Sequence, residues 1–487
     1  MRSPEYILHS ILVKMIMLAA LCQTLRAMSG QVVVADAYET KRQPNLIIIL
    51  TDDQGYGDLR CFGSKTIKTP RLDKIASEGL KLTNFYAQPV CGPSRAALMT
   101  GCYPMRVHGG GWRVASDEIM ISELLKPVGY ATACIGKWDM SDRRYIKGEV
   151  PNDQGFDYYY GTLNATDKGR VMLMENRTDI GETRDMASLT RDYTNKAIKY
   201  IRDHKDKPFF LYLAHSMPHI QIDASPQFKG TSQGDLYGDV IEEIDWNVGR
   251  LLDVLQELNL VKNTIIVFTS DNGPWIGVEE YARKRHGGHQ STGSAGPLRG
   301  GKGSSWEGGV REPCIIWGPG YIPAGRISSE IISTLDVLPT FAKFAGAKVP
   351  TDRVIDGRDQ SRLFTGKTDK TAHDTYYYYG RTNLQAVRKG KWKLALNNRK
   401  RFYPYAKDNL PVDKPQLYDM DVDIGEKHDL AAEHPGVVTD LLKLAEQVRD
   451  DLGDVKNRPG RNVRRTATEK SHEQENASPY TTELNND

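Results

Sequence analysis

The segment Asn45–Leu50, with the sequence NLIIIL, decides the fold class of this chain. Its apolar residues are consecutive rather than alternating, which is typical of a strand buried on both faces of a sheet. Amphipathic stretches of helical length follow, the clearest being Gly238–Leu258. Further strand-like runs lie between such stretches: Ala131–Ile135, Phe209–Ala214, Thr264–Thr269 and Cys314–Trp317. Strands that alternate with helices predict an α/β domain with a largely parallel central sheet covered on both sides.

Length and composition are those of an ordinary globular protein. The chain has 487 residues, of which 39% are hydrophobic and 26% are charged. This length predicts one large domain and a smaller one. The formal net charge is only +3, and no basic block is interleaved with aromatic residues. We therefore expect no nucleic-acid partner, although local positive charge in a pocket could attract an anionic substrate.

The N-terminal region has the features of an export signal. Arg2 precedes the apolar stretch Ile11–Cys22, and small residues follow at Ala27 and Ala35–Ala37. The apolar stretch is shorter than the roughly 20 residues that a transmembrane helix needs. We assign residues 1–37 to a signal peptide and expect an exported protein without a stable membrane span. A retained anchor and a lipoprotein modified at Cys22 are the alternatives.

The sequence pattern changes after residue 350. Short runs at Tyr376–Tyr379 and Trp392–Leu396 predict a small antiparallel sheet, and residues 435–452 predict an amphipathic helix. From residue 454 onward the chain is polar, and we expect it to be disordered. We therefore divide the chain into a main domain, residues 38–350, a C-terminal subdomain, residues 351–453, and a tail, residues 454–487.

Acidic residues directly follow two of the predicted strands. Asp52 and Asp53 come after the first strand, and Asp271 and Asn272 come after the strand Thr264–Thr269. The carboxyl ends of strands in such sheets are where ligands collect. Neighbouring carboxylates repel each other, so a buried cluster needs a cation, and oxygen ligands suit Ca²⁺ before Mg²⁺. The alternative is a pair of strand-terminal turns, which Asp, Asn and Gly also favour.

Cys91 opens the run Cys91–Arg95, with the sequence CGPSR, at the start of a predicted helix. This run resembles the C-x-P-S-R signature of type I sulfatases. In that family the cysteine is oxidised after translation to formylglycine, whose hydrated aldehyde is the nucleophile. The resemblance therefore implies a partner that matures the cysteine, either a formylglycine-generating enzyme or an anaerobic maturation enzyme. The alternative is a buried cysteine before a helix N-terminus, where a low thiol pKa is also expected.

The resemblance extends over nearly the whole chain, from about Pro44 to about Gly453. Its segments occur in the family's order: PNLIIILTDDQGYGDL from Pro44, GKW from Gly136, MPH from Met217, SDNGPW from Ser270 and GGKGSSWEGGVREP from Gly300. It looks most like the arylsulfatase A and N-acetylgalactosamine-6-sulfatase branch. The resemblance implies an alkaline-phosphatase-like three-layer sandwich with a smaller C-terminal antiparallel sheet and helix.

The same resemblance implies a metal site. Its Ca²⁺ ligands would be Asp52, Asp53, Asp271, Asn272 and the matured Cys91. Asp271 is also the family's candidate for accepting the proton of the attacking hydroxyl, if one of its oxygens stays off the metal.

Four further residues match family positions around the nucleophile. Arg95 would hold the matured side chain by charge-assisted hydrogen bonds. Lys137 and Lys302 match lysines that clamp the sulfate oxygens. His219 matches the histidine near the ester oxygen and would protonate the leaving group, with Lys302 as the less favoured acid. A solvated role for each lysine and a capping role for His219 remain open.

Asp139 departs from the family pattern, which commonly has a histidine after the Gly-Lys-Trp segment. In the family that histidine hydrogen-bonds the nucleophile and helps to release sulfate. Asp139 could still accept a proton, but its charge would weaken the binding of an anionic ester. Two alternatives are that it turns aside to pair with Lys137 or Arg143, or that it contacts the substrate.

We therefore expect an enzyme, a sulfuric ester hydrolase of the arylsulfatase type that acts on a sulfated small molecule or glycan, with a carbohydrate favoured. Two alternatives remain. One is a phosphatase or phosphonate hydrolase on the same scaffold, and the other is a catalytically impaired binding protein, for which Asp139 is the only sign.

Overall fold

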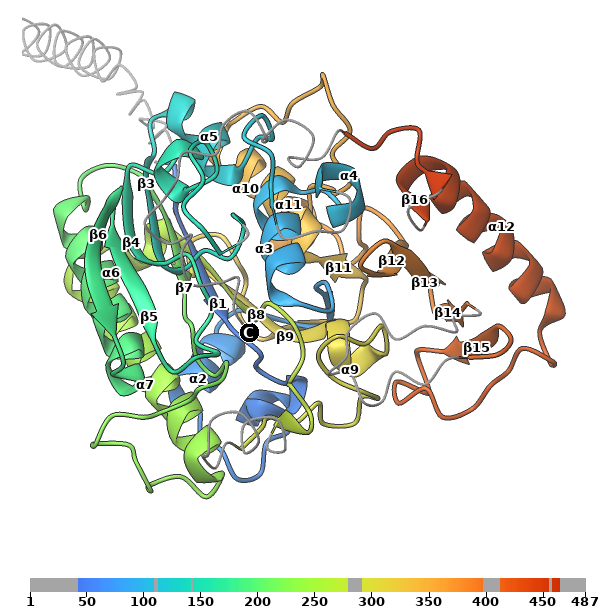
Figure 1. Ribbon diagram of the computed structural model, residues 1–487, viewed down its shortest axis with the longest axis horizontal. Helices are drawn as coiled ribbons and strands as arrows, with labels where there is room; N and C mark the ends of the chain where they lie inside the picture. The colour runs from blue at the N-terminus through green and yellow to red at the C-terminus, as the bar shows by residue number, and fades with distance from the viewer. Residues whose placement is uncertain are drawn as a thin grey trace, which may run out of the picture. The chain divides into compact units, whose positions relative to one another are not determined.

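An 11-stranded sheet forms the centre of the computed structural model, which describes residues 43–108, 113–141, 143–278, 291–396, 412–454 and 458–464. The strand order is β10-β2-β9-β8-β1-β7-β3-β4-β5-β6, with β11 paired to β2 (Figure 1). The strands are β1 (Asn45–Thr51), β2 (Leu80–Tyr86), β3 (Ala131–Lys137), β4 (Tyr158–Thr162), β5 (Val171–Glu175), β6 (Thr178–Thr183), β7 (Phe209–Ala214), β8 (Thr264–Ser270), β9 (Arg311–Trp317), β10 (Arg326–Ser328) and β11 (Ile332–Ser333). All five strands predicted from apolar runs are present.

The centre of this sheet is parallel, as the sequence predicted. β1 pairs in parallel with β7 and β8, and β3 pairs in parallel with β7 and β4. β9 is antiparallel to both of its neighbours, β8 and β2. The carboxyl ends of β1, β3, β7 and β8 therefore meet at one edge of the sheet.

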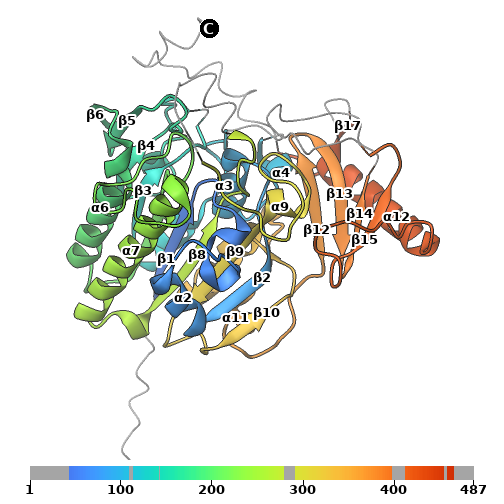
Figure 2. The same ribbon diagram turned by 90° about the horizontal axis from the view of Figure 1, so that it is seen from below.

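Helices cover both faces of the sheet, so the domain has three layers (Figure 2). Ile47 and Ile49 of β1 belong to one hydrophobic core, which includes residues of α2 (Pro70–Ser77), α6 (Leu189–Asp203) and α7 (Asp235–Glu257). Ile48 belongs to the opposite core, which includes residues of α3 (Cys91–Thr100), α5 (Ile121–Leu125), α10 (Val337–Ala345) and α11 (Ser361–Phe364). Successive side chains of β1 point to opposite faces of the sheet, and both faces are buried. This explains why the apolar residues of β1 are consecutive. The short helices α4 (Pro104–His108) and α9 (Glu307–Val310) complete the main domain.

The C-terminal region is a four-stranded antiparallel sheet with one helix packed on it. Its strands, in spatial order, are β12 (Thr375–Gly380), β13 (Asn383–Lys389), β14 (Trp392–Ala395) and β15 (Gln416–Asp419). The helix α12 (Pro435–Leu452) buries Leu441, Ala445 and Val448 in the same core as residues of β13 and β14.

A buried ion cluster joins this sheet to the main domain. Lys393 of β14 lies 3.0 Å from Glu307 and 2.7 Å from Glu426, and all three side chains are fully buried. Lys393 also donates to the backbone carbonyl of Ser305, three residues after Lys302. The C-terminal sheet therefore supports the segment that carries one of the predicted sulfate-binding lysines.

Two of the predicted segments, the signal peptide and the C-terminal tail, lie wholly or partly outside the described residues. The predicted signal peptide, residues 1–37, lies outside them, as do residues 455–457 and 465–487 of the predicted tail. The remaining tail residues are not extended into solvent. β16 (Gly453–Asp454) pairs with β17 (Arg458–Pro459), and Arg464 forms an ion pair with Glu118 of the main domain. Among the described residues, none of the helices combines the length and the apolar character that a bilayer crossing requires.

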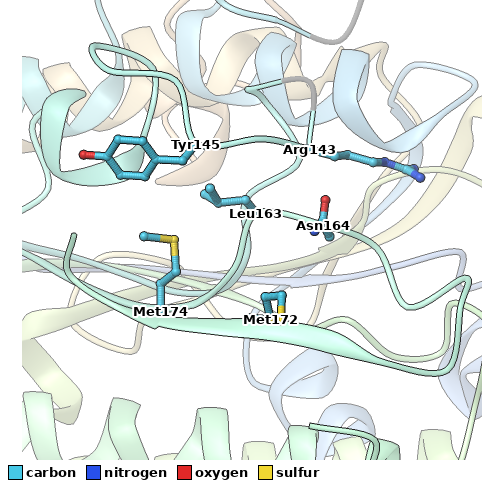
Figure 3. Close-up of a pocket in the computed structure, with 6 residues that line it drawn as sticks. All are labelled: Arg143, Tyr145, Leu163, Asn164, Met172 and Met174. Atoms are coloured by element: carbon cyan, nitrogen blue, oxygen red, sulfur yellow. The ribbon is translucent and has the colours of Figure 1, made fainter. Parts of the chain in front are cut away.

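A small hollow lies beside β4 and β5, near one end of the sheet (Figure 3). It is lined by Arg143, Tyr145, Leu163, Asn164, Met172 and Met174. The first two residues belong to the segment after β3, the next two follow β4, and the methionines belong to β5.

Candidate active site

The two acidic clusters lie side by side at the carboxyl edge of the sheet. Thr51 of β1 and Ser270 of β8 are paired in the strand register, so the residues that follow each strand are neighbours. The backbone N–H of Asp53 donates to Asp271 Oδ1 over 3.2 Å. Asp52, Asp53, Asp271 and Asn272 are all buried. The sequence prediction that these clusters converge is therefore confirmed.

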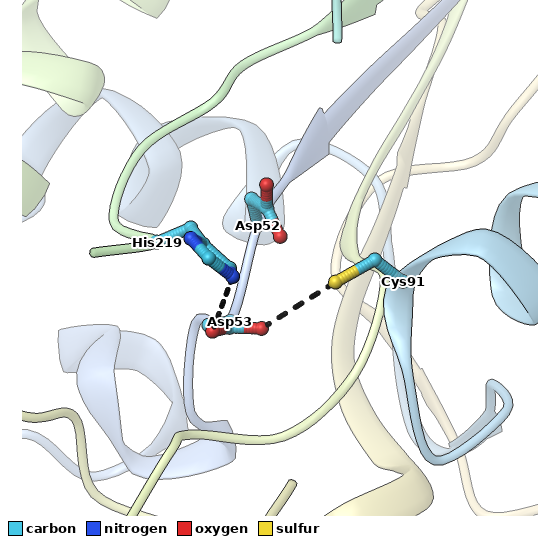
Figure 4. Close-up of side chains that lie close together, drawn as sticks. All are labelled: Asp52, Asp53, Cys91 and His219. Atoms are coloured by element: carbon cyan, nitrogen blue, oxygen red, sulfur yellow. Dashed lines mark hydrogen bonds and ion pairs between the residues drawn. The ribbon is translucent and has the colours of Figure 1, made fainter. Parts of the chain in front are cut away.

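Cys91 faces this cluster from the first residue of α3 (Figure 4). Its Sγ lies 3.9 Å from Asp53 Oδ1, and only 1% of the residue is exposed. Candidate ligand atoms of Asp52, Asp53, Cys91 and His219 all lie within 4.8 Å of one another. Burial raises the pKa of the Cys91 thiol well above its ordinary value, although Lys137 and Lys302 oppose this effect. The encoded thiol is therefore protonated and a poor nucleophile, contrary to the low pKa that a helix start alone would favour.

Three buried cations neutralise the aspartates. Lys137 Nζ lies 2.7 Å from Asp52 Oδ2, and Lys302 Nζ lies 2.7 Å from the carboxylate of Asp53. Arg95 donates from Nε and from a terminal nitrogen to Asp271 Oδ2, over 3.0 and 2.7 Å.

Three carboxylates, those of Asp52, Asp53 and Asp271, thus face three cations around Cys91. A divalent cation would add positive charge to this cluster, which suits an anionic sulfate ester.

The buried oxygens support a hard-cation site at this cluster. Asp52 Oδ1 and Asn272 Oδ1 are buried and have no hydrogen-bond donor among the described residues. Asn272 Nδ2 donates to Asp53 Oδ1 over 2.8 Å, which leaves its carbonyl oxygen for another partner. Two orphaned oxygens beside further carboxylates are the donor set that Ca²⁺ prefers. Asp52 and Asn272 therefore fit as ligands. Asp53 belongs to the same group of candidate ligand atoms, although its oxygens accept from Asn272 and Lys302.

Asp271, the fourth protein oxygen ligand predicted, is engaged on both oxygens, as Asp53 is. Asp271 Oδ1 accepts from the Asp53 backbone and Asp271 Oδ2 accepts from Arg95. Burial and then the neighbouring Asp52 raise the pKa of Asp271 to about 7. The pKa of Asp52 is instead held below its ordinary value, because Lys137, His219 and Arg95 outweigh its burial. A bound cation would lower the pKa of Asp271 as well.

The contacts of Arg95 differ from those predicted, because its guanidinium contacts Asp271 and Lys137 rather than Cys91. Besides Asp271, its guanidinium donates to the backbone carbonyl of Lys137 over 2.9 Å. Within the described part of the chain, no hydrogen bond joins Arg95 to Cys91. In this structure Arg95 orients Asp271 and the end of β3, and a contact to the matured residue at position 91 stays a prediction.

His219 presents Nε2 to the cluster. Its Nδ1 donates to the carbonyl of Ile220 over 2.6 Å, so in the neutral ring the proton is on Nδ1, and Nε2 lies 3.6 Å from Asp53 Oδ2. Burial and then Lys302 lower the pKa of His219. The position agrees with the sequence prediction, but a neutral imidazole must gain a second proton before it can act as an acid at Nε2.

Asp139 is turned toward Arg143. Arg143 Nε lies 2.9 Å from Asp139 Oδ1, whereas Lys137 Nζ lies 3.4 Å from Asp139 Oδ2. The pKa of Asp139 is lowered despite complete burial, because Arg143 and Lys137 stabilise its charge. The sequence left open whether Asp139 acts as a base, pairs with Lys137 or Arg143, or contacts the substrate. In the structure it lies beside both Arg143 and Lys137. A low pKa makes Asp139 a weak base.

Asp167 was not predicted as a site residue. Its Oδ2 lies 2.9 Å from Arg143, and its Oδ1 lies 3.8 Å from His219 Nε2. It belongs to the segment between β4 and β5, where the sequence LNATDKG has only the features of an ordinary turn. No sequence signal placed it beside His219.

A sulfatase family model matches residues 44–347, and a model of the C-terminal region of aryl-sulfatase matches residues 371–478. The chain belongs to the sulfatase family. The predictions of family, fold class and enzyme class are thereby confirmed.

Two curated relatives differ in the substrates that their names state. This sulfatase is 34% identical over 442 residues to steryl-sulfatase of Homo sapiens, which covers 73% of this chain and 75% of that protein. It is 36% identical over 390 residues to N-acetylgalactosamine-6-sulfatase of Rattus norvegicus, which covers 72% of this chain and 71% of that protein.

A solved structure from work on the metabolism of multiple glycosaminoglycans by Bacteroides thetaiotaomicron is also similar to this sulfatase. Its TM-score is 0.75 at 28% sequence identity, and the match covers 84% of this chain and 99% of that one.

Proposed function

We propose that this sulfatase hydrolyses a sulfate monoester of a carbohydrate, with a nucleophile formed from Cys91 by maturation to formylglycine and with Ca²⁺ bound beside it. The observation that carries the proposal is the position of Cys91, which begins α3 and directs its Sγ toward Asp53. Formylglycine would supply two hydroxyls on one carbon, one for attack on sulfur and one for the release of sulfate. Ca²⁺ fits this oxygen-rich cluster better than Mg²⁺ and would polarise the sulfate.

The buried lysines are suited to binding the sulfate group. Lys137 and Lys302 each contact one aspartate of the cluster. Once a cation balances Asp52 and Asp53, the two ammonium groups can donate to sulfate oxygens instead. Both lysines lie in a water-poor site, where such contacts are stronger than in solution.

The leaving oxygen needs a proton, since an alkoxide is a poor leaving group. His219 Nε2 faces the reaction centre, but its lowered pKa favours the neutral ring. Lys302 already carries protons and lies on the same side of Asp53. We therefore keep both residues as candidate general acids and give Lys302 more weight than the sequence alone did.

A carbohydrate is the substrate class that the similarities support best. The name of one relative specifies N-acetylgalactosamine, and the solved structure comes from work on glycosaminoglycans. The similarity to steryl-sulfatase makes a steryl sulfate the second candidate. We also propose that residues 1–37 direct export and that a maturation enzyme acts on Cys91 before or during that step.

Steady-state kinetics on paired synthetic substrates test the proposal. An aryl sulfate should give a higher kcat/KM than the matching aryl phosphate, and Cys91→Ala should abolish sulfate hydrolysis. Phosphate hydrolysis that exceeds sulfate hydrolysis and survives in Cys91→Ala would support a phosphatase instead. A panel of galactose 6-sulfate, N-acetylgalactosamine 6-sulfate and a steryl sulfate then ranks the natural substrate classes.

A further inference from the structure

The turn that leads to Cys91 has a hydrogen-bond donor at each of its backbone carbonyls. This turn, residues 87–90, connects the end of β2 to the start of α3. Three of its four carbonyls accept from groups of the main domain. These hydrogen bonds run from the Ser94 hydroxyl to Gln88 over 2.9 Å, from the Gly303 N–H to Pro89 over 2.7 Å and from the Ser94 N–H to Val90 over 3.1 Å.

The fourth carbonyl of the turn accepts from the C-terminal sheet. Tyr376 of β12 donates its hydroxyl to the carbonyl of Ala87 over 2.6 Å, and the same hydroxyl oxygen accepts from Nε2 of Gln88 over 2.9 Å. Burial raises the pKa of Tyr376 well above its ordinary value, so the hydroxyl remains a donor. β12 is the strand of its sheet that lies nearest the main domain (Figure 2). One hydroxyl of the C-terminal sheet therefore holds two consecutive residues of the turn.

The ring of Tyr376 is itself held in place. Only 1% of the residue is exposed. The ring stacks on Tyr86, with the ring centroids 4.8 Å apart, and meets Tyr378 edge to face at 4.9 Å. The hydroxyls of Tyr86 and Tyr378 both donate to Glu307, which also pairs with the buried Lys393. A donor fixed by its own packing can determine where the turn lies rather than follow it.

We propose that Tyr376 is a positioning residue for the nucleophile, because it fixes the turn from which the side chain at position 91 projects toward Asp53. The inference rests on the proposed sulfatase function and extends it to the C-terminal sheet. Cys91 directly follows the turn, so a shift of the turn would change the direction in which its side chain points. A misplacement of about 1 Å can reduce a rate by about a hundredfold. Tyr376 acts through the backbone of the turn and not by contact with the ester.

Tyr376→Phe removes the hydroxyl and keeps the ring. We expect kcat for an aryl sulfate, divided by the matured fraction of the protein, to fall by about tenfold to a hundredfold. KM should change by less than about twofold, because the lysines that would bind the sulfate are untouched. Mass spectrometry of the peptide that contains position 91 gives the matured fraction. Inorganic sulfate, used as a competitive inhibitor, should have the same inhibition constant for the variant and for the wild-type protein.

Tyr379→Phe is the matched control. Tyr379 belongs to the same strand, is 3% exposed and donates its hydroxyl to a backbone carbonyl, that of Gly453, over 2.8 Å. Gly453 begins β16 and is not part of the turn before Cys91. Both variants should lower Tm, since each leaves a buried carbonyl without its donor, but only Tyr376→Phe should lower kcat. A purely structural role for Tyr376 would lower Tm in both variants and kcat in neither.

Gln88→Met tests the same hydrogen-bonded group from the side of the turn. It removes the Nε2 donor to Tyr376 and keeps an unbranched side chain of similar length. We expect kcat per matured protein to fall by about twofold to tenfold, as for the loss of a neutral hydrogen bond. If Tyr376→Phe does not fold, Gln88→Met decides between the same outcomes.

Three results would overturn the inference. They are an unchanged kcat per matured protein in Tyr376→Phe, an equal loss of kcat in Tyr379→Phe, and a loss of activity that the matured fraction alone explains. Failure of the matured wild-type protein to hydrolyse the aryl sulfate would instead refute the proposed function, so the two failures are distinguishable.

Discussion

Arg143 Nε lies 2.9 Å from Asp139 Oδ1, so the aspartate that departs from the family pattern has an arginine partner four residues later. The same guanidinium reaches Asp167, which lies near His219. A residue that accepts a proton during the release of sulfate needs a pKa that is not far below neutral. Arg143 and Lys137 instead lower the pKa of Asp139, although the residue is buried. The geometry therefore favours a structural and charge-balancing role for Asp139 over a catalytic one.

Asp139→Asn keeps the shape of the side chain and removes its charge. We expect kcat for an aryl sulfate to fall by less than about tenfold, and KM to fall, because one negative charge near the anionic substrate is lost. Steady-state kinetics at several pH values check this. A working general base contributes about a hundredfold or more, so a loss of that size in kcat, with a displaced pH profile, would assign the proton transfer to Asp139.

Metal removal should lower both activity and thermal stability. Asp52 Oδ1 and Asn272 Oδ1 are buried without hydrogen-bond donors, so a bound cation would stabilise the folded protein by ligating them. A ligand at a hundred times its Kd stabilises a protein by about 2.7 kcal/mol, which a melting curve detects. We expect a chelator to lower Tm and Ca²⁺ to restore it more effectively than Mg²⁺.

Asn272→Ala should reduce that Ca²⁺-dependent rise in Tm. Equal melting curves with and without Ca²⁺ for the wild-type protein would contradict a calcium site at this cluster.

The ion pair between Lys137 and Asp52 should stabilise the fold in the absence of metal. Both side chains are fully buried, and removal of one partner of such a pair costs about 3–5 kcal/mol. Urea unfolding of Lys137→Met in the presence of chelator measures this loss. Lys199→Met is the control, since Lys199 pairs with Asp203 on the surface, where a pair contributes about 0–1 kcal/mol. A loss no larger than that of the control would show that Asp52 is not charged in the metal-free protein.

The buried cluster around Lys393 should make stability depend on pH. Burial raises the pKa of Glu426 to about 7, and neighbouring Glu307 adds to the effect, although Lys393 opposes it. A carboxyl group with a raised pKa in the folded state binds its proton more tightly there than in the unfolded chain. Its contribution to stability therefore falls as the pH rises from about 4.5 to about 7 and then stays level.

Glu426→Gln removes this titration. We expect its free energy of unfolding to exceed that of the wild-type protein at pH 8 and the difference to shrink toward pH 5. A variant that is less stable than wild type at both pH values would mean that Glu426 is charged and stabilised by Lys393.

Much of the fold could be predicted from sequence because the decisive segments are local. The run NLIIIL needs cover on both faces of its strand, and CGPSR carries its family resemblance within five residues. Convergence of Asp52 with Asp271 followed from the geometry of parallel strands, since the carboxyl ends of neighbouring strands meet at one edge.

The rest of the site depends on contacts that no local pattern encodes. Asp167 comes from a turn between β4 and β5 and reaches His219 only through the packing of those strands. The engagement of both Asp271 oxygens, and the neutral state of His219, depend on burial and on donors from distant segments. The tail residues 458–464 were expected to be disordered because they are polar, but Arg464 finds a buried carboxylate at Glu118.

The most direct test of the central claim is mass spectrometry of the peptide that contains Cys91, from protein made in a host with the maturation enzyme. We expect the thiol to be replaced by an aldehyde, with loss of sulfur, in the protein that hydrolyses an aryl sulfate. An unmodified thiol in protein with full sulfatase activity would contradict it.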